Sequence, residues 1–225
     1  MFNYILSRRW FFLRSETDRM LTVSMLFSVL LVLAGMIYTT YFVFLFLVWN
    51  LFLAYIPYAV SNWLQNNPGW IENKWKFSLG FIVWILFVPN TFYLVTDLFH
   101  LGQTYWVPSW FDLIVLVSFA WNGLLLGFIS IRQMEKIMEV KIGTQSLWKF
   151  TYPVILLNAF GVYIGRYLRY NSWDFVTNPF QLFKDMAKMI VFPFNNLYAW
   201  GMIFCFSVFM LVIYMAFKFL GRMRW

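Results

Sequence analysis

From Met20 to Val60 the chain runs for 41 residues without a charged side chain. A single α-helix of that length would measure about 60 Å, which is twice the thickness of the hydrocarbon core of a bilayer. The run therefore predicts two membrane-spanning helices joined by a tight turn. Gly35 and Thr39-Thr40 are the residues best suited to that turn.

The composition of the whole chain agrees with this interpretation. Only 12% of the residues are charged and 62% are hydrophobic, whereas a soluble domain is about 25% charged and 45–50% apolar. The formal net charge of +8 would favour nucleic acid in a soluble protein. In a membrane protein, basic residues flank the spans and meet anionic lipid. We therefore expect membrane lipids as partners, and no nucleic acid.

The remaining apolar runs complete the predicted architecture, an all-α polytopic membrane helix bundle of about six spans. A basic, aromatic segment at residues 1–19 is expected at the cytoplasmic interface, and residues 20–225 form a single transmembrane domain. The fourth span continues as a helix into water through Arg132, Glu135 and Lys141. The predicted spans are 20–38, 41–60, 75–95, 112–131, 147–165 and 198–219.

The segment before the last span has its own pattern. Asn178-Pro179 is typical of a helix start, with a capping side chain followed by proline at the first helical position. The polar residues then fall at i, i+3, i+4 and i+7, so they share one helical face. This pattern predicts an amphipathic helix at about 179–191, lying flat on the outer membrane surface as an anchor or as a lid over a site. Its polar residues are Gln181, Lys184, Asp185 and Lys188.

The distribution of lysine and arginine predicts the orientation. With the N-terminus inside, cytoplasmic segments hold thirteen of the 17 Lys and Arg residues. Positive charge accumulates on the cytoplasmic side of membrane proteins. Both termini are therefore expected in the cytoplasm.

The first candidate site lies in the stretch PNTFYLVTDLFHL, residues 89–101. Proline inside a span removes a backbone hydrogen bond, so Pro89 predicts a broken helix, and the amide of Asn90 can satisfy the freed carbonyls. Asp97 and His100, the only histidine, lie three residues apart. Such a pair can orient a histidine as a general base, hold a loop, or contribute to a metal site.

The second candidate site is the stretch GRYLRYNSWD, residues 165–174. If the helix continues, Arg166 and Arg169 face the same way, and two guanidinium groups can clamp a phosphate or carboxylate. They can equally pair with nearby carboxylates. By helical rise, both arginines lie near the same interface as Asp97, His100 and Asp112, while Asn50, Asn122 and Asn158 lie near mid-membrane as links between helices. The candidate ligand-binding residues are Asn90, Asp112, Arg166, Arg169, Asn171 and Asp174.

No cofactor and no metal site are expected. The chain has one histidine and one cysteine, Cys205, which excludes an intrachain disulfide and a cysteine-based metal site. No Gly-x-Ser-x-Gly nucleophile motif and no His-Glu-x-x-His motif is present.

The two stretches resemble the signature stretches of a bacterial integral-membrane family known as domain of unknown function 1361. The resemblance covers most of the chain after about residue 20. It implies a multi-span protein of a bacterial plasma membrane. It brings no reaction and no catalytic residue.

Three functions stay open at this point. The first is a site at the outer interface that binds an anionic amphiphile, such as a phospholipid or polyprenyl-phosphate-linked precursor, in lipid or envelope handling. The second is a membrane hydrolase with Asp97 and His100 as catalytic residues. The third is an accessory subunit that packs against another membrane protein.

Overall fold

The computed structural model describes residues 16–39, 42, 44–102 and 107–221. These ranges are helical and contain no strand, and six of their helices are long and apolar enough to cross a membrane. The predicted all-α bundle is confirmed. The long helices are α2 (Glu16–Thr39), α3 (Leu45–Gln65), α5 (Lys74–Thr96), α6 (Ser109–Ile142), α7 (Trp148–Arg166) and α10 (Leu197–Leu220).

Shorter elements connect the long helices. α4 (Pro68–Glu72) joins α3 to α5, η2 (Asp97–His100) follows α5 directly, and η3 (Thr144–Ser146) joins α6 to α7. α8 (Asp174–Thr177), α9 (Pro179–Val191) and η4 (Pro193–Asn196) lie between α7 and α10. The bounds of α9 are those of the predicted amphipathic helix. Of the predicted basic segment, Arg8, Arg9 and Arg14 lie outside the described residues.

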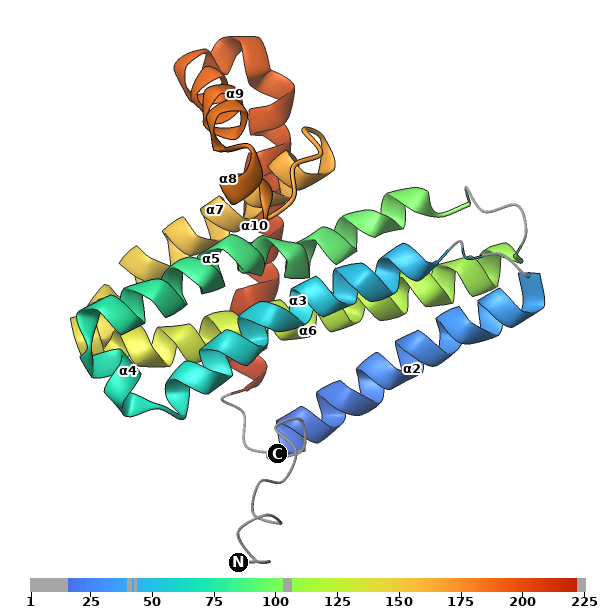
Figure 1. Ribbon diagram of the computed structural model, residues 1–225, viewed down its shortest axis with the longest axis horizontal. Helices are drawn as coiled ribbons and strands as arrows, with labels where there is room; N and C mark the ends of the chain where they lie inside the picture. The colour runs from blue at the N-terminus through green and yellow to red at the C-terminus, as the bar shows by residue number, and fades with distance from the viewer. Residues whose placement is uncertain (1–15, 40–41, 43, 103–106, 222–225) are drawn as a thin grey trace, which may run out of the picture.

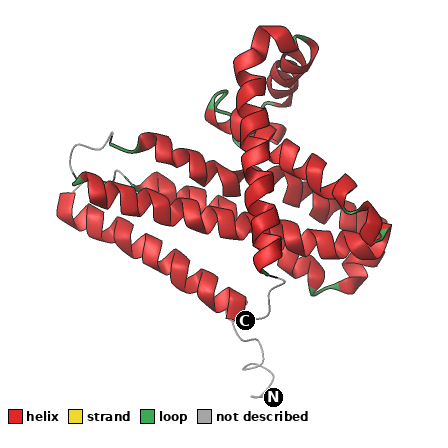
Figure 2. Ribbon diagram, turned by 180° about the vertical axis from the view of Figure 1, so that it is seen from behind, coloured by secondary structure: helices red, strands yellow, loops and turns green. Residues whose placement is uncertain are grey.

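The helices pack around α3, α5 and α6, which contact one another pairwise. α2 lies along α6, and α7 lies between α5 and α10. α10 crosses the other long helices at a steep angle, and α8 and α9 project from the bundle at the start of α10 (Figures 1 and 2). α6 runs back from the end of α5, so Asp97 and Glu135 lie at opposite ends of the bundle. The two ends of the bundle are named the Asp97 end and the Glu135 end.

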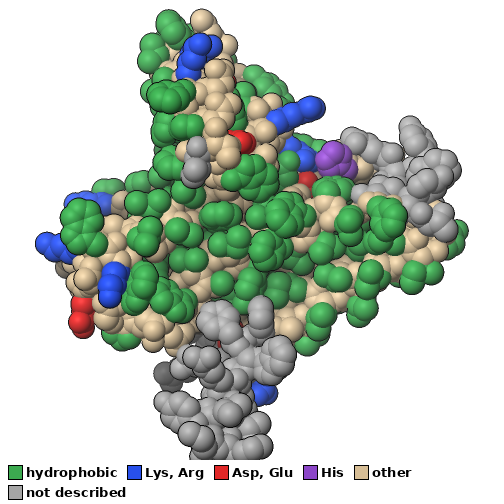
Figure 3. Space-filling view, viewed as in Figure 1, with side chains coloured by type: hydrophobic (Ala, Val, Ile, Leu, Met, Phe, Trp, Pro, Cys, Tyr) green, Lys and Arg blue, Asp and Glu red, His purple; other side chains and the backbone are tan. Residues whose placement is uncertain are grey.

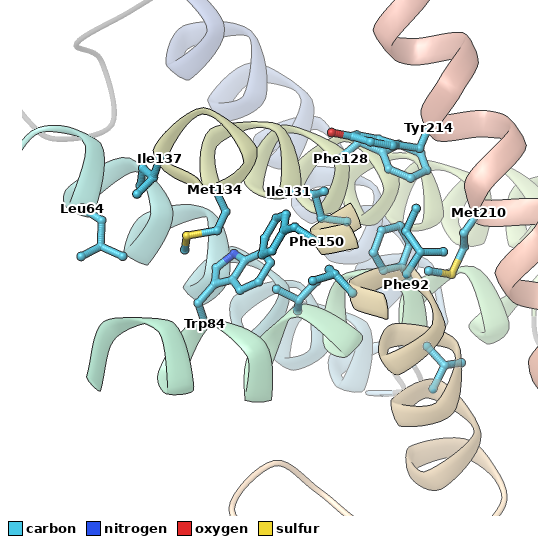
Figure 4. Packing of buried hydrophobic residues seen from close by; sticks show 14 residues of the cluster. Leu64, Trp84, Phe92, Phe128, Ile131, Met134, Ile137, Phe150, Met210 and Tyr214 are labelled. Carbon is cyan, nitrogen blue, oxygen red and sulfur yellow. The ribbon is translucent and has the colours of Figure 1, made fainter. Parts of the chain in front are cut away.

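The largest hydrophobic cluster joins five helices (Figure 4). Trp84 of α5 stacks against Phe150 of α7, with ring centroids 6.1 Å apart. Phe128 of α6 contacts both Phe92 of α5 and Tyr214 of α10. A second cluster joins α2 and α3 to α5 and α6. The bundle therefore has a packed interior, although lipid, not water, is its expected surroundings.

α5 and α6 approach unusually closely, because glycine on α6 faces α5. A Cβ atom at Gly123 would lie 2.2 Å from the Thr91 carbonyl oxygen. A Cβ atom at Gly127 would lie 2.5 Å from the Thr91 hydroxyl. Gly161 of α7 likewise faces the Pro89 ring, at 2.6 Å. Small residues allow helix backbones to meet in membrane bundles, and here they bring α6 and α7 onto the same part of α5.

The predicted break at Pro89 is wrong, because α5 continues through this residue to Thr96. The carbonyls near the proline find other partners. Asn90 Nδ2 donates to the Phe87 carbonyl at 3.0 Å, and Ser172 Oγ donates to the Leu86 carbonyl at 3.2 Å. Side chains can satisfy freed backbone groups and so let a membrane helix tolerate proline. The carbonyl that Pro89 leaves without its helical N–H donor is that of Ile85, whereas Asn90 bonds the nearby Phe87 carbonyl, so the role predicted for its amide stays a prediction.

The surface agrees with a membrane environment. On the face in view in Figure 3, hydrophobic side chains cover the middle of the bundle, and lysine and arginine gather at the end that holds α4 and on and beside the projection. Large apolar side chains are well exposed elsewhere on the bundle too, as at Ile37 of α2 and Val212 of α10. Large exposed apolar areas need a non-aqueous partner. The six apolar helices and this surface indicate a multi-pass membrane protein.

Candidate functional site

Asp97 and Arg166 form an ion pair at one end of the bundle. Asp97 begins η2, directly after α5, and Arg166 is the last residue of α7. Arg166 Nη1 lies 3.1 Å from Asp97 Oδ1, and the side chains are 12% and 1% exposed, respectively. The two sequence stretches therefore meet in space. Of the two roles predicted for Arg166, an anion clamp or a partner for a nearby carboxylate, the structure shows pairing with the Asp97 carboxylate.

The Arg166 guanidinium is held on several sides. It donates to the Tyr93 hydroxyl at 3.2 Å and to the Thr96 carbonyl. Its central carbon also lies 5.2 Å from the Tyr93 ring centre and 5.6 Å from that of Phe99. Arginine stacks on aromatic faces while its N–H groups stay bonded. Arg166 is thus fixed in one position by α5 and η2.

Asn50 completes this arrangement from a third helix. Its Nδ2 donates to Asp97 Oδ2 at 3.1 Å, so both carboxylate oxygens accept a hydrogen bond. The sequence predicts Asn50 near mid-membrane, and this is wrong because α3 begins only at Leu45, which puts Asn50 in its second turn. Asn50 was missed as a site residue. A polar side chain in the first turns of a span is the signal that could have identified it.

His100 and Asp112 also lie near this end of the bundle. The His100 ring packs edge-on against Phe46, with centroids 5.7 Å apart. Asp112 is 1% exposed, and its Oδ2 accepts from the Gly102 amide at 2.9 Å. Its Oδ1 has no hydrogen-bond partner in the described part of the chain. Asp112 thus holds the chain after η2, and catalysis by Asp97 and His100 stays a prediction.

Arg169 does not share a helical face with Arg166, contrary to the sequence analysis. α7 ends at Arg166, and Arg169 has a left-handed backbone with φ 59°. Its side chain is exposed. The premise of a two-arginine clamp on one helix is therefore wrong, because the helix stops between the two residues.

Asn171 lies in the loop that follows α7, and Asp174 is the first residue of α8. The Asn171 amide donates to Asp174 Oδ2 at 2.6 Å, and the Thr177 hydroxyl donates to Asp174 Oδ1 at 3.0 Å. Both bonds organise the start of α8. Ser172, between them, accepts from Asn90 Nδ2 at 2.9 Å. This contact ties the loop to α5, and sequence reasoning had not singled out Ser172.

A cavity of about 390 Å³ lies where these elements meet. We call it the Asn90 cavity. α3, α5 and α7 form its walls, and the loop after α7 and the apolar face of α9 border it. Its polar lining residues are Asn50, Asn90, Tyr93, Tyr170, Asn171 and Ser172, and those from α9 are Leu182, Phe183 and Met186.

A hydrogen bond positions α9 against this cavity. The Tyr170 hydroxyl donates to Asp185 Oδ2 at 2.8 Å. That bond lowers the pKa of the Asp185 carboxyl below its ordinary value. Tyr170 therefore connects the loop of the second stretch to the polar face of α9, while the opposite face of α9 borders the cavity.

No group of three or more His, Cys, Asp or Glu side chains that could hold a metal ion occurs among the residues that the structure describes. Chemically, the Asn90 cavity offers an apolar volume with hydrogen-bonding side chains on its walls. Asp97 and His100 do not line it. The buried ion pair beside it holds two of its lining residues, Asn50 and Tyr93.

A comparison with family models gives one match, described as "Protein of unknown function (DUF1361)", over residues 49–213. The matched region includes both stretches and the Asn90 cavity, and it leaves α2 outside. No curated protein and no solved structure matches the chain.

Proposed function

Since the chain belongs to the DUF1361 family of proteins of unknown function, as the resemblance predicted, we propose its function from its own residues. It binds an anionic amphiphile, of phospholipid or polyprenyl-phosphate type, in the Asn90 cavity and acts in lipid or envelope handling. The observation that carries the proposal is the lining of this cavity, to which both stretches and the amphipathic helix α9 contribute.

The apolar walls suit the hydrocarbon part of such a ligand. Ligand cavities are mostly apolar, with a few polar groups that orient the ligand, and measure about 300–1,000 Å³. The volume of about 390 Å³ falls within this range. Phe183 and Leu157 line the cavity and are also exposed on the outside of the protein. This supports entry of a ligand from the surrounding lipid.

The loop after α7 suits the polar part of the ligand. Tyr170, Asn171 and Ser172 present hydrogen-bonding groups to the cavity. Arg169, next to Tyr170 in the chain, is exposed and forms no ion pair with another described residue. We assign the anion contact to Arg169. Arg166, whose charge is balanced by Asp97, instead holds Tyr93 in the cavity wall.

The proposal includes an orientation. The Asp97 end faces the outside of a bacterial plasma membrane, and both termini lie in the cytoplasm. The support is the excess of lysine and arginine in the segments assigned to the inside, thirteen of 17 residues. Cysteine accessibility at Ser109, at the start of α6, and at Gly143, after its end, would test this orientation.

Replacing Leu157 by tryptophan should reduce the amount of amphiphile that the purified protein retains at least several-fold. The larger ring fills part of the Asn90 cavity, while the exposed position of Leu157, at 52%, limits the damage to packing. The measurement is native mass spectrometry of the detergent-purified protein.

Arg169→Ala should lower retention of anionic species more than that of zwitterionic species.

Leu156→Trp is the matched control. Leu156 is the neighbouring residue on α7, is 48% exposed and does not line the cavity. It should leave retention unchanged. Equal retention by the wild type and both tryptophan variants would contradict the proposal. The hypothesis of an accessory subunit, tested by co-purification of a membrane-protein partner, would then come first.

A further inference from the structure

The opposite end of the bundle has its own buried carboxylate. The Glu135 side chain is fully buried and accepts hydrogen bonds from three helices. Arg132 Nη1 lies at 2.8 Å and Lys218 Nζ at 3.1 Å from Oε2, and the Thr151 hydroxyl donates to Oε1. One carboxylate thus positions two cations, from α6 and from the last turn of α10.

Lys218 lies between two cavities, since it lines both. The first, of about 510 Å³, is here called the Lys136 cavity, and three cations line it: Arg132, Lys136 and Lys218. Tyr58, Gln65 and Gln133 add polar groups to its lining. No acidic side chain is among the described residues that line it. This cavity is therefore suited to an anion.

The charges around the Lys136 cavity do not cancel. Arg132 and Lys218 share the single charge of Glu135. Asp18 is 5% exposed and accepts from the Tyr58 hydroxyl, and neither Asp18 nor Glu135 lines this cavity. Lys136 is exposed and forms no ion pair within the described part of the chain. An excess of positive charge in a partly enclosed site favours a phosphate group.

The second cavity, of about 410 Å³, lies between α7 and α10, and most of its exposed lining is apolar, although Glu135, Thr151 and Lys218 also line it. We call it the Met215 cavity. It opens beside aromatic side chains that are exposed, Trp148 at 56% and Tyr152 at 45%. Such residues gather at the level of lipid headgroups. The buried Tyr214 hydroxyl also lines it and interacts with the Glu135 carboxylate.

We propose that these two cavities form one site for a phospholipid with an anionic headgroup. Its phosphate lies in the Lys136 cavity against Lys136, Arg132 and Lys218, and one acyl chain lies in the Met215 cavity. Lys218 marks the boundary between headgroup and chain. The site is separate from the Asn90 cavity, which lies toward the other end of the bundle, so it stands whether or not the proposed function holds.

The test is a titration of the detergent-purified protein with dioleoylphosphatidylglycerol and dioleoylphosphatidylcholine, followed by native mass spectrometry. The wild type should bind the phosphatidylglycerol more tightly. Lys136→Ala should weaken that binding about fivefold, since a basic side chain near an anionic lipid contributes about 1 kcal/mol. Lys74→Ala removes an exposed charge from the same end without touching either cavity and should have little effect.

A second pair of measurements identifies the source of the phosphate. Met215→Trp fills the apolar cavity and should weaken lipid binding several-fold, while glycerol 3-phosphate should compete only weakly in every variant. Strong competition by glycerol 3-phosphate would overturn the lipid assignment. If Lys136→Ala and Lys74→Ala weaken phosphatidylglycerol binding equally, the proposed site is wrong. The loss caused by Lys136→Ala should be the same in a Leu157→Trp background, in which the Asn90 cavity is partly filled, and this distinguishes the two cavities.

Discussion

Replacing Asp97 by alanine should lower the free energy of unfolding by about 3–5 kcal/mol, the usual cost of leaving one partner of a buried ion pair unpaired. The Arg166 guanidinium is 12% exposed, so it would keep its charge with little access to water. Asn50 would lose its acceptor as well. Thermal unfolding of the detergent-purified protein, followed by tryptophan fluorescence, measures the change.

Two further variants separate this cost from the loss of the side chain itself. Combining Asp97→Leu with Arg166→Met removes both charges and should restore much of the stability, because apolar side chains can replace a buried pair. Asp174→Ala removes a carboxylate that bonds the Asn171 amide and the Thr177 hydroxyl at the start of α8 and should cost about 1 kcal/mol or less. If Asp97→Ala lowers the free energy of unfolding no more than Asp174→Ala does, the stabilising role assigned to the Asp97–Arg166 ion pair is contradicted.

Gly123→Ala should destabilise the protein by about 3 kcal/mol, at the upper end of the usual cost of overpacking. The new methyl group would lie 2.2 Å from the Thr91 carbonyl oxygen, which belongs to the backbone and cannot rotate away. α5 and α6 would have to move apart, and both hydrophobic clusters would lose packing because each contains residues from these two helices. Thermal unfolding again gives the measurement.

Gly201→Ala is the matched substitution in another long helix. A Cβ atom at Gly201 meets nothing within 4 Å, so this change should leave the unfolding temperature almost unaltered. If both glycine variants unfold at the wild-type temperature, α5 and α6 do not approach as closely as described.

The spans could be predicted from the sequence because the bilayer imposes a length and an apolar composition on each of them. α9 could be predicted for a similar reason. Its polar residues repeat with the helical period, and Asn178-Pro179 precedes them. These signals depend on local order along the chain, so no knowledge of neighbouring helices was needed.

The candidate site was predicted only in part, because its geometry depends on contacts between helices. That Asp97 and Arg166 lie at the same end follows from helical rise, but their pairing depends on how α5 and α7 are rotated toward each other. Asn50 was misplaced because the predicted span, 41–60, begins four residues before α3, which is about 6 Å along a helix. Arg169 was misplaced because nothing local marks the end of α7 at Arg166.

The two buried polar centres have a mechanical consequence for α7. At its last residue, Arg166 is bound to Asp97, and in its first turn, Thr151 is bound to Glu135. Because α7 is bound at each end to a different helix, it cannot shift along its axis without lengthening either the Arg166–Asp97 ion pair or the Thr151–Glu135 hydrogen bond. α7 should therefore keep its axial position, and any motion that opens the bundle must come from the helices on either side of it.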